Sequence, residues 1–376
     1  MVRLTVRLLS RALALLSTPK LLALGRALGS FWFHLIPVRR GVAIRAAARA
    51  FPEKSPREVR ALVKANFQHL MTSLLESAAS ISWPLPRLKT LVRYEGVEEC
   101  LRAPRAAGKG VIGVSAHLGN FEMGFDAFGA LNEVPLVLIA RVPKGGLGRE
   151  LLEAARSRGG TIEVMEPKGS GPKAVEALTG RKAVLAFVID QNLRRGRGIF
   201  VPFLGELANT TTGFASLQRR AGAFLMAVQF WRDPDGVQQA RLFPIAPDDH
   251  PHPRVAIIND VLALSRKIES FVRERPEQWF WVHRRWKARP APGDLVRQED
   301  GLFRFGKGRV AAFLPPDAPD APTATRLLER AGIAVHSPAS SPEGVDREGS
   351  LHLSLGATDL VPRVNQFLDA LFAATS

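Results

Sequence analysis

The amino-acid sequence predicts an α/β fold in which helices flank a largely parallel central sheet. The first observation behind this prediction is a regular alternation of short apolar runs and helical segments from residue 111 onward, because such alternation produces parallel strands joined by helices. The second is that two of the apolar runs, 111–116 and 183–189, end directly in polar residues, and the sites of parallel sheets lie at the carboxyl ends of their strands. We also expect a membrane-associated helical segment at the N-terminus and a small α/β appendage at the C-terminus.

The composition indicates a globular protein with an anionic partner. Hydrophobic residues make up 46% of the 376 residues, which is enough for a substantial core, and the net charge is +17. The single cysteine, Cys100, excludes a disulfide framework and a multi-cysteine metal site, and it fits a reducing compartment. No cluster of His, Asp and Glu in the sequence indicates a metal site, so we expect neither a metal nor a cofactor. The charge alone does not choose among nucleic acid, a membrane and an acidic protein.

The positive charge is concentrated toward the N-terminus. The first fifty residues contain nine Lys or Arg and no acidic residue, whereas residues 301–376 contain seven basic and eight acidic residues. Arg3, Arg7 and Arg11 recur every four residues and therefore form one cationic face of a helix. Leucines occupy its other faces, which is typical of a helix that lies on an anionic membrane surface. Arg11 also interrupts the apolar run, and no small-x-small cleavage site follows, which argues against a secretory signal.

We interpret residues 1–40 as an embedded or interfacial membrane anchor. Thr18-Pro19-Lys20 breaks the first helix. The following run, 21–38, is mostly apolar but contains Arg26 and His34, which makes it marginal for crossing a bilayer. A true single span is the second interpretation, and a helical hairpin that packs on the protein's own core is the third.

The other elements follow in order along the chain. A helix over 55–82 begins at Ser55-Pro56 and ends before Trp83-Pro84. We then expect strands at 91–94, 111–116, 134–140, 162–165 and 183–189, alternating with helices that begin at 97 and 121 or cover 148–158 and 173–178. Further along are a helix over 214–222, an edge hairpin of strands 224–231 and 240–245, and a helix over 261–275. For the C-terminal part of the chain, the sequence predicts strands at 309–314, 333–336 and 351–355 and helices over 325–331 and 361–373.

These elements predict three parts of the chain: the membrane anchor 1–40, a main α/β domain 41–292, and a C-terminal extension 293–376. The extension is nearly neutral and contains no motif that indicates a role.

His117 follows the buried strand 111–116 directly, and a Leu-Gly turn then leads to Asn120. Asn120 is a favoured N-cap, so we expect a helix to begin at Phe121 and to carry Glu122 in its first turn. A carboxylate that holds one ring nitrogen of a histidine leaves the other to take a proton from a hydroxyl. We therefore expect His117 to be a general base oriented by Glu122. The alternative is a structural imidazole beside a carboxylate that merely favours the start of a helix.

A second polar block follows the strand 183–189. Asp190-Gln191-Asn192 begins it, and Arg194, Arg195 and Arg197 continue it on a flexible loop. Arginines in such a loop suit bidentate binding of phosphate. For each arginine the alternative is an ordinary solvated position, because surface arginines are common.

Two further segments carry basic residues. Residues 166–173 form a Gly-rich loop with Lys168, and the backbone N–H groups and the lysine of such a loop suit phosphate. The spacing is not that of a Walker A loop, and a plain flexible loop is the alternative. Residues 277–290 interleave aromatic and cationic side chains, as in a surface that stacks on single-stranded nucleic acid or in an interfacial belt. The polar residues of this second segment include His283, Arg284 and Arg285.

Three blocks of the sequence together resemble the late (lauroyl/myristoyl) acyltransferases of lipid A biosynthesis, within the lysophospholipid acyltransferase superfamily. The first is His-Leu-Gly-Asn-Phe-Glu at 117–122, which has the His-x4-Glu pattern of that superfamily. The second is Asp-Gln-Asn at 190–192 with Val-Pro-Phe-Leu-Gly at 201–205. The third, 276–290, closely resembles the closing signature of the family and is the most specific of the three. The resemblance covers about residues 1–292.

The resemblance implies an acyltransferase-type domain over 41–292 at the cytoplasmic face of the bacterial inner membrane. The implied reaction moves a fatty acyl chain from acyl-carrier protein or acyl-CoA to a hydroxyl of a lipid A precursor, an anionic glycolipid, with His117 as the base and Glu122 as the residue that orients it. Family members usually carry an arginine where this chain has Lys168. We expect the substrate and its phosphates to contact Asn120, Lys168, Asp190, Gln191, Arg194, Arg195, Arg197, His283, Arg284 and Arg285.

Three other functions are weighed against this one. The acceptor is alternatively another glycolipid or a lysophospholipid. A serine hydrolase is a weaker interpretation, because Gly-Val-Ser-Ala-His at 113–117 partly imitates a nucleophile elbow but has His117 where the elbow needs a small residue. A basic nucleic-acid-binding protein is weaker still, since the sequence has no helix-turn-helix or RNA-binding signature, and we expect no nucleic-acid partner.

Overall fold

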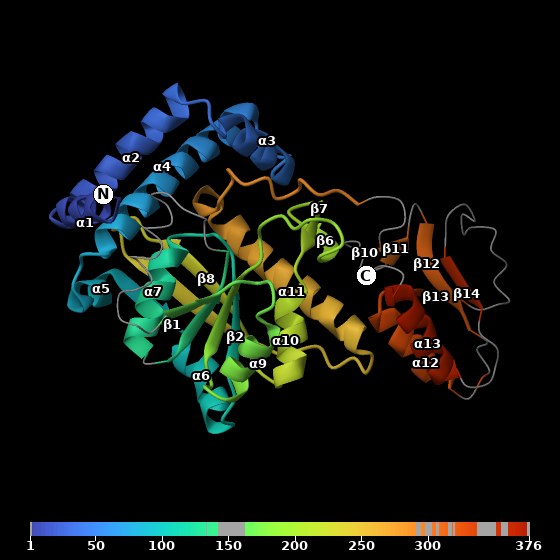
Figure 1. Cartoon of the computed structure of the whole chain (residues 1–376). Helices are drawn as coiled ribbons and strands as arrows, with labels where there is room; N and C mark the ends of the chain where they lie inside the picture. Colours follow the sequence, from blue (N-terminus) through green and yellow to red (C-terminus); the bar gives the residue numbers. More distant parts are fainter. Residues whose placement is uncertain are drawn as a thin grey trace. The chain divides into compact units, whose positions relative to one another are not determined.

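The structure, a computed structural model, describes residues 2–132, 134–141, 162–290, 295–297, 303–305, 308–314, 318, 320–336, 351–354 and 360–373 (Figure 1). The chain divides into two compact units, which are described separately. Unit 1 comprises 1–190, 216–246 and 267–284, and unit 2 comprises 191–215, 247–266 and 285–376. The helix predicted over 148–158 lies outside the described residues.

Unit 1 begins with five helices, which are α1 (Val2–Ala14), α2 (Thr18–Leu35), α3 (Arg40–Ala50), α4 (Pro56–Ser80) and α5 (Leu85–Leu91). The break predicted around Pro19 is confirmed, because α2 begins there and carries Pro19 in its first turn, where proline is tolerated. The long helix predicted to begin at Ser55-Pro56 is also confirmed as α4. A capping box fixes its start, in which the Ser55 hydroxyl accepts from the Glu58 backbone and the Glu58 carboxylate accepts from the Ser55 backbone.

Helices α2 and α4 pack closely along two glycines of α2. A Cβ atom on Gly25 would lie 2.5 Å from the Cα atom of Thr72, and a Cβ atom on Gly29 would lie 2.4 Å from the Cα atom of Gln68. Both distances are far below van der Waals contact, so only glycine permits this approach of the two helices. The side-chain amide of Gln68 adds a hydrogen bond to the Ser30 hydroxyl at 2.7 Å.

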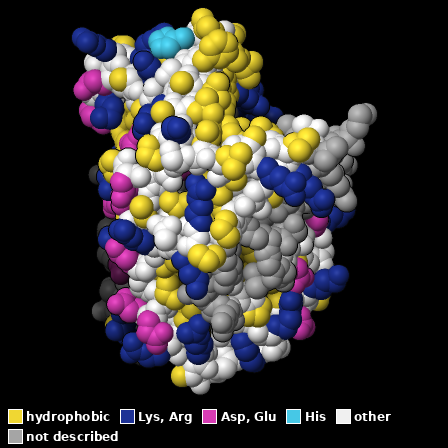
Figure 2. All heavy atoms as spheres, turned by 90° about the vertical axis from the view of Figure 1, so that its left-hand side faces the viewer, with side chains coloured by type: hydrophobic (Ala, Val, Ile, Leu, Met, Phe, Trp, Pro, Cys, Tyr) yellow, Lys and Arg dark blue, Asp and Glu magenta, His cyan; other side chains and the backbone are white. Residues whose placement is uncertain are grey.

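The N-terminal helices also expose apolar side chains. Figure 2 shows one face of the molecule. Hydrophobic side chains gather on it over the N-terminal helices, and Lys and Arg side chains lie beside them. The exposed large apolar residues of α1, α2 and the adjoining segments are Leu8, Leu9, Leu15, Leu24, Leu28, Phe31, Leu35, Ile36 and Val38. Among the described helices, none taken singly has the length and apolarity to cross a bilayer. The pair formed by Thr5–Ala14 and Thr18–Leu35 meets both criteria together, with a bend of 120° between its two helices.

The central sheet of unit 1 confirms the predicted α/β fold. Its described strands lie in the order β1-β9-β8-β2-β5-β3-β4, and every neighbouring pair is parallel except β8 with β9. The bounds are β1 (Val92–Glu95), β2 (Val111–Ser115), β3 (Leu136–Ile139), β4 (Ile162–Met165), β5 (Val184–Val188), β8 (Phe224–Arg232) and β9 (Gln238–Ile245). The helices of this part are α6 (Val97–Ala106), α7 (Phe121–Asn132), α9 (Gly171–Thr179), α10 (Gly213–Ala221), α11 (Pro253–Glu274) and the short 3₁₀ helix η1 (Pro276–Gln278), with α10 and α11 continuing into unit 2.

An apolar core joins one face of this sheet to α6 and α7. Phe125 and Phe128 of α7 and Leu101 of α6 are buried against strand residues such as Val184 and Met226. Strands β2 and β5 are buried along almost their whole length, which explains why both appear in the sequence as continuous apolar runs.

One predicted detail of the sheet is wrong. The sequence predicts the strands over 224–231 and 240–245 as an edge hairpin, and β8 and β9 do pair as antiparallel neighbours. However, β9 is not at the edge, because β1 pairs with it in parallel from Val92 opposite Gln238 to Glu95 opposite Arg241. The outer strand is instead β1, whose four residues and alternating burial are typical of an edge.

Unit 2 contains the predicted C-terminal elements together with two segments from the middle of the chain. Its described strands lie in the order β13-β12-β11-β10-β6-β7, and β14 also pairs with β12. The bounds are β6 (Ile199–Phe203), β7 (Glu206–Thr210), β10 (Leu295–Arg297), β11 (Phe303–Phe305), β12 (Gly308–Phe313), β13 (Ala334–His336), β14 (Leu351–Ser354), α12 (Ala321–Arg330) and α13 (Leu360–Ala373). Val296 of β10 pairs in parallel with Phe200 of β6, so segments on the two sides of residue 292 belong to one sheet. The domain boundary at residue 292 remains a prediction.

The hairpin of β6 and β7 is not among the elements predicted from the sequence. Leu204 and Gly205 join the two strands, and both have positive φ angles, of 53° and 74°. Two consecutive residues of positive φ form the tight turn that suits the twist of a two-residue hairpin.

Helix α11 begins at Pro253, eight residues before the predicted start at Val261. The sequence predicts a later start because it contains Asn259 and Asp260, and both residue types favour helix ends over helix interiors. In the structure their side chains have tertiary partners instead, because the Asn259 amide donates to the Arg330 carbonyl at 3.1 Å and the Asp260 carboxylate accepts from the Asp248 backbone at 2.7 Å.

The glycine contact between α2 and α4 predicts a steric effect. We expect Gly29→Val to lower the free energy of unfolding by about 3 kcal/mol, because overpacking a close contact costs about 1–3 kcal/mol and here the added atoms meet backbone. Ala27→Val, on the exposed face of the same helix, is the matched control and costs less than about 1 kcal/mol. Urea unfolding of both variants in detergent tests this, and an equal cost for the two would contradict the packing described above.

Candidate active site

The strand order of unit 1 brings His117 and Asp190 together. Strands β2 and β5 are parallel neighbours that pair from Val111 opposite Val184 to Ser115 opposite Val188. His117 lies two residues beyond the end of β2, and Asp190 lies two residues beyond the end of β5. Ser115 and Val188 are opposite each other, so His117 and Asp190, each two residues further on, lie at the same edge of the sheet.

The Asp190 carboxylate holds His117 by two hydrogen bonds. Its Oδ1 accepts from the Nδ1 atom of the imidazole at 2.7 Å, and its Oδ2 accepts from the backbone N–H of His117 at 2.9 Å. The indole Nε1 of Trp279 donates to the same Oδ2 at 2.6 Å. Only 2% of the Asp190 side chain is exposed, against 19% for His117, so the carboxylate is covered while the imidazole is accessible.

These contacts keep Asp190 ionised although it is buried. Burial by itself raises the pKa of a carboxyl group, but the charge of a protonated His117 and the hydrogen bonds from the His117 ring, the Trp279 indole and the His117 backbone together lower the pKa of Asp190 to about 2. The ionised carboxylate therefore accepts the proton of Nδ1, and in the neutral imidazole Nε2 becomes the basic nitrogen.

Aromatic rings fix the plane of the imidazole. The ring of Phe121 meets it edge to face with 4.8 Å between the centroids, and the ring of Phe280 stacks on it at 5.8 Å. His117 is therefore restrained by the carboxylate at one nitrogen and by rings at its edge and face.

The turn that follows His117 is held on one side by the segment after η1. Leu118 forms an isolated antiparallel bridge with Trp279, and the Phe280 backbone N–H donates to the His117 carbonyl at 3.1 Å. Gly119 has φ of 62°, and a Cβ atom there would lie 2.7 Å from the carbonyl oxygen of Phe230. Only glycine fits this position, for conformational and steric reasons at once.

Asn120 caps α7, as predicted. Its Oδ1 accepts from the Met123 backbone N–H at 3.3 Å and from the Ser77 hydroxyl at 3.0 Å. The helix therefore begins at Phe121, and Glu122 lies half-buried in its first turn. The carboxylate that the structure places on Nδ1 of His117 is that of Asp190, so the predicted action of Glu122 on the imidazole remains a prediction.

The other predicted site residues of unit 1 lie at its surface or close to it. Lys168 is exposed in the turn that precedes α9, Arg284 is exposed, and His283 is half-buried in the segment after η1. In unit 2, Gln191, Arg194, Arg195 and Arg197 are exposed on the loop that precedes β6.

Arg285 differs from these exposed residues because it is buried. Its Nη1 donates to the carbonyls of Gln191 and Asn209, both at 2.8 Å, and its Nη2 donates to the Thr210 hydroxyl at 2.6 Å. These contacts hold the start of the arginine loop against β7. Among the residues that the structure describes, no group of three or more His, Cys, Asp and Glu is placed to hold a metal ion.

Two contacts of this site, those of Trp279 and of Asp190, are not predicted from the sequence. Trp279 belongs to the most specific of the three sequence blocks, yet its contact with Asp190 requires two segments 89 residues apart to meet. Asp190 is among the residues predicted to contact substrate, and in the structure both of its oxygens accept hydrogen bonds inside the protein. A contact of Asp190 with substrate remains a prediction. The sequence does show that Asp190, like His117, directly follows a buried strand. It does not show that these two strands, β2 and β5, are neighbours in the sheet.

The fold and this geometry define a class of enzyme. A partly exposed imidazole at the edge of a parallel sheet, fixed by a buried, ionised carboxylate, is an arrangement suited to general-base chemistry on a hydroxyl. The comparisons with known proteins name the reaction. The family model of bacterial lipid A biosynthesis acyltransferases matches residues 4–288, and the chain belongs to this family. It is an acyltransferase of lipid A biosynthesis.

Curated relatives agree with this assignment. The chain is 29% identical to the lipid A biosynthesis palmitoleoyltransferase of Escherichia coli (strain K12) over 276 residues, which are 72% of this chain and 86% of the relative. It is 28% identical to the lipid A biosynthesis lauroyltransferase of the same organism, over 72% of this chain and 87% of that relative. A lipid A biosynthesis acyltransferase of Shigella flexneri is 29% identical over the same shares of the two chains as the first.

The low pKa of Asp190 predicts a specific pH dependence of stability. In the unfolded chain an aspartate has a pKa of about 3.9, so the lowered folded value stabilises the protein above that pH, and this stabilisation is lost as the pH falls from about 4 toward about 2. The difference between the two pKa values corresponds to about 2.6 kcal/mol. As the pH falls over that range, we expect the wild-type protein to lose more unfolding free energy than Asp190→Asn, and the extra loss to equal this amount.

Urea unfolding between pH 2 and pH 5 provides the measurement, with Asp235→Asn as the control because Asp235 is an exposed residue of the β8–β9 turn. Equal pH dependence for the wild-type protein and Asp190→Asn would mean that the carboxylate is not held as described.

Proposed function

We propose that this acyltransferase moves a fatty acyl chain from an acyl thioester to a hydroxyl of a lipid A precursor, with His117 as the general base. The observation that carries the proposal is the hydrogen bond between Asp190 and Nδ1 of His117 at 2.7 Å, because it leaves Nε2 as the nitrogen that takes a proton. The family supplies the class of reaction, and the two residues supply its chemistry.

The reaction follows from this tautomer. Nε2 of His117 takes the proton of the acceptor hydroxyl while the hydroxyl oxygen attacks the thioester carbonyl carbon. The tetrahedral intermediate places negative charge on the former carbonyl oxygen, and backbone N–H groups at the start of α7 are suitable donors for it. The carbon–sulfur bond then breaks, and the imidazolium returns its proton to the leaving thiolate. Ester and thiol are the products, with no acyl-enzyme and no change of redox state.

We assign the two carboxylates of the site different tasks. Asp190 keeps the proton on Nδ1 and stabilises the imidazolium through a direct hydrogen bond. Glu122, five residues after His117 in the first turn of α7, stabilises the same positive charge by Coulomb attraction, which is stronger in a partly buried site than in water. Asn120 and Arg285 then serve to position loops rather than to bind substrate.

The remaining predicted residues are proposed as ligands for the anionic acceptor. Gln191, Lys168, His283, Arg284 and the three arginines of the 191–197 loop offer hydrogen-bond donors, and arginine in particular binds phosphate bidentately. The donor we propose is acyl-carrier protein or acyl-CoA. Both are acidic, and the excess of basic residues before residue 300 favours their association as well as that of phosphorylated glycolipids.

We propose that α1 and α2 associate with the cytoplasmic face of the bacterial inner membrane. Exposed apolar side chains such as Leu15, Phe31 and Leu35 supply the apolar contact. The absence of acidic residues from the first fifty positions favours anionic lipid headgroups. The helix pair bends by 120° at residues 15–17, which suits a segment that enters the interface and returns.

The first test is acyl transfer by purified protein from acyl-carrier protein to a tetraacyl lipid A precursor. We expect His117→Ala to lower kcat by at least about 10²–10⁴-fold, the usual contribution of a general base. His336→Ala, a half-buried histidine of β13, is the control and retains the wild-type rate. A His117→Ala variant with full activity would disprove the assignment of the base, and wild-type protein that acylates only another glycolipid or a lysophospholipid would correct the acceptor.

A second test separates the carboxylates. We expect Asp190→Asn to lower kcat by about 10²–10⁴-fold, and we expect no further loss when it is combined with His117→Ala, because two groups that act as a unit are not additive. Steady-state kinetics of both single variants and the double variant provide the measurement. If Asp190→Asn is fully active while Glu122→Gln is inactive, the orienting carboxylate is Glu122, as the His-x4-Glu motif predicts.

A further inference from the structure

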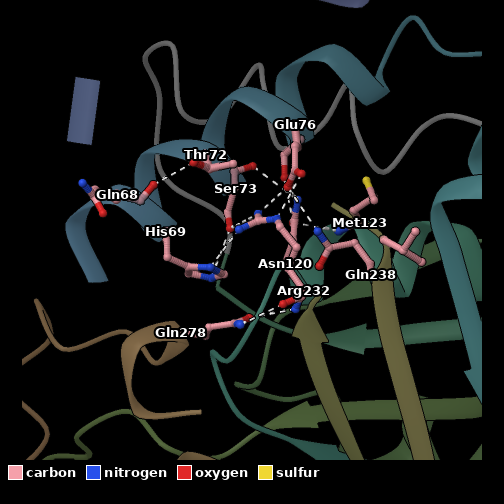
Figure 3. Close-up of polar contacts among 12 residues, drawn as sticks. Gln68, His69, Thr72, Ser73, Glu76, Asn120, Met123, Arg232, Gln238 and Gln278 are labelled. Atoms are coloured by element: carbon pink, nitrogen blue, oxygen red, sulfur yellow. Dashed lines mark hydrogen bonds and ion pairs between the residues drawn. The ribbon is translucent and has the colours of Figure 1, made fainter. Parts of the chain in front are cut away.

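A buried polar cluster lies behind the turn that carries His117. Its centre is an ion pair between Glu76 of α4 and Arg232 at the end of β8, whose side chains are only 3% and 8% exposed. Arg232 donates from Nε to Glu76 Oε1 at 3.1 Å and from Nη2 to Glu76 Oε2. Figure 3 shows these side chains converging from α4, β8 and β9, and we call this group, with His69, Ser73 and Gln238, the Glu76–Arg232 cluster.

Every donor nitrogen of Arg232 has a partner within this cluster. Nη1 contacts the Nδ1 atom of His69 at 2.8 Å, and Nη2 also donates to the Ser73 hydroxyl at 2.8 Å. Burial and the Arg232 charge hold the pKa of His69 well below its ordinary value, against a hydrogen bond with the Gly119 backbone that raises it. His69 is therefore neutral and accepts from the guanidinium at Nδ1.

The cluster reaches the 117–120 turn directly at Asn120. The Asn120 amide nitrogen donates to Glu76 Oε2 at 3.1 Å. Glu76 is thus separated from the start of α7 by a single side chain. Gln238 of β9 donates to the same Glu76 oxygen at 3.2 Å, which further fixes the carboxylate.

A third connection runs through the segment on the opposite side of the turn. The Gln278 side chain accepts from the Arg232 backbone N–H at 2.8 Å and donates to the Arg232 carbonyl at 2.9 Å. The Gln278 carbonyl in turn accepts from the Gly119 backbone N–H at 3.2 Å. Trp279, which holds Asp190, is the next residue. The strand end that carries Arg232 therefore contacts the segment that holds both the 117–120 turn and, through Trp279, Asp190.

Stability alone does not explain a buried ion pair of this kind. Two charges removed from water lose their hydration, and well-packed apolar residues often give equal or greater stability at such a position. What the charged groups offer instead is direction, because the fork of the guanidinium and the two carboxylate oxygens permit few alternative geometries. A reactive imidazole needs this kind of restraint, since small misplacements of a catalytic group lower the rate strongly.

We propose that the Glu76–Arg232 cluster is a positioning device for the reaction, which holds the 117–120 turn so that His117 and the start of α7 keep their catalytic geometry. This inference rests on the proposed role of His117. Glu76 and Arg232 act through Asn120, Gly119 and Gln278 and do not touch the substrate.

The decisive variant is the double substitution Glu76→Gln and Arg232→Gln. It removes both charges and leaves no buried charge without a partner, so the fold is retained while the directed contacts are lost. We expect the unfolding midpoint to stay close to that of the wild-type protein, kcat to fall at least tenfold, and KM for the acceptor to change less than twofold. A folded double variant with wild-type kcat would overturn the inference.

Hydrogen exchange supplies a readout that does not depend on activity. We expect the amides of residues 117–124 to lose at least tenfold in protection in the double variant, while those of α9 keep theirs. Unchanged protection at 117–124 would overturn the inference even if kcat fell. The matched control is Glu95→Gln with Arg241→Gln, an ion pair at 2.6 Å between β1 and β9 whose side chains are 53% and 46% exposed, and it leaves kcat and exchange unchanged.

Arg232→Lys decides the question if the double variant does not fold. Lysine keeps a positive charge opposite Glu76 but loses the fork to His69 and Ser73, so we expect reduced protection at 117–124 and a smaller loss of kcat than for Arg232→Gln. Wild-type values of both quantities would overturn the inference. His117→Ala in the same assay separates the two proposals. Full activity of His117→Ala would refute the role of His117 as the base. If His117→Ala is inactive while the cluster variants keep wild-type kcat, only the positioning role is refuted.

Discussion

The parallel pairing of β2 with β5 is the constraint on which the rest of the site depends. The register of these two buried strands brings Asp190 and His117, 73 residues apart in the chain, to one edge of the sheet and within hydrogen-bonding distance. The tautomer of the imidazole and the ionised state of the carboxylate both follow from this contact. A change of one residue in this register would direct one of the two side chains to the opposite face of the sheet, and no adjustment of the loops would restore the contact.

The segment after η1 and the Glu76–Arg232 cluster support this contact from different directions. Trp279 fills the space beside Asp190 and satisfies one of its oxygens, while Phe280 covers the imidazole. The cluster behind the turn contributes no atom to the chemistry, yet it contains a pair of charges whose burial carries an effective penalty of several kcal/mol per ion. The proposed use of this costly pair is the geometry that it imposes on the turn after His117.

The sequence predicts those parts of the site that are local in the chain. The strand before His117, the turn after it and the Asn120 cap each depend on a few consecutive residues, and all three are confirmed. Asp190 could be placed at a strand end but not beside His117, because the order of strands in a sheet is not encoded in any single segment. Glu76 and Arg232 were not identified for a related reason. On a helix and a strand end they resemble ordinary surface charges, and only the contact between two segments 156 residues apart shows that they are buried.

Helix α4 has a consequence for how this protein can change over evolutionary time. One side of the helix packs against glycines of α2 with no room for another atom, and another side carries His69, Ser73 and Glu76 toward the catalytic turn. A shift of the helix that relieves one side disturbs the other, so substitutions on its two faces cannot accumulate independently. Exposed positions of α4 such as Leu74 are free of this coupling, and a change in the surface of α2 has to evolve without moving the helix behind it.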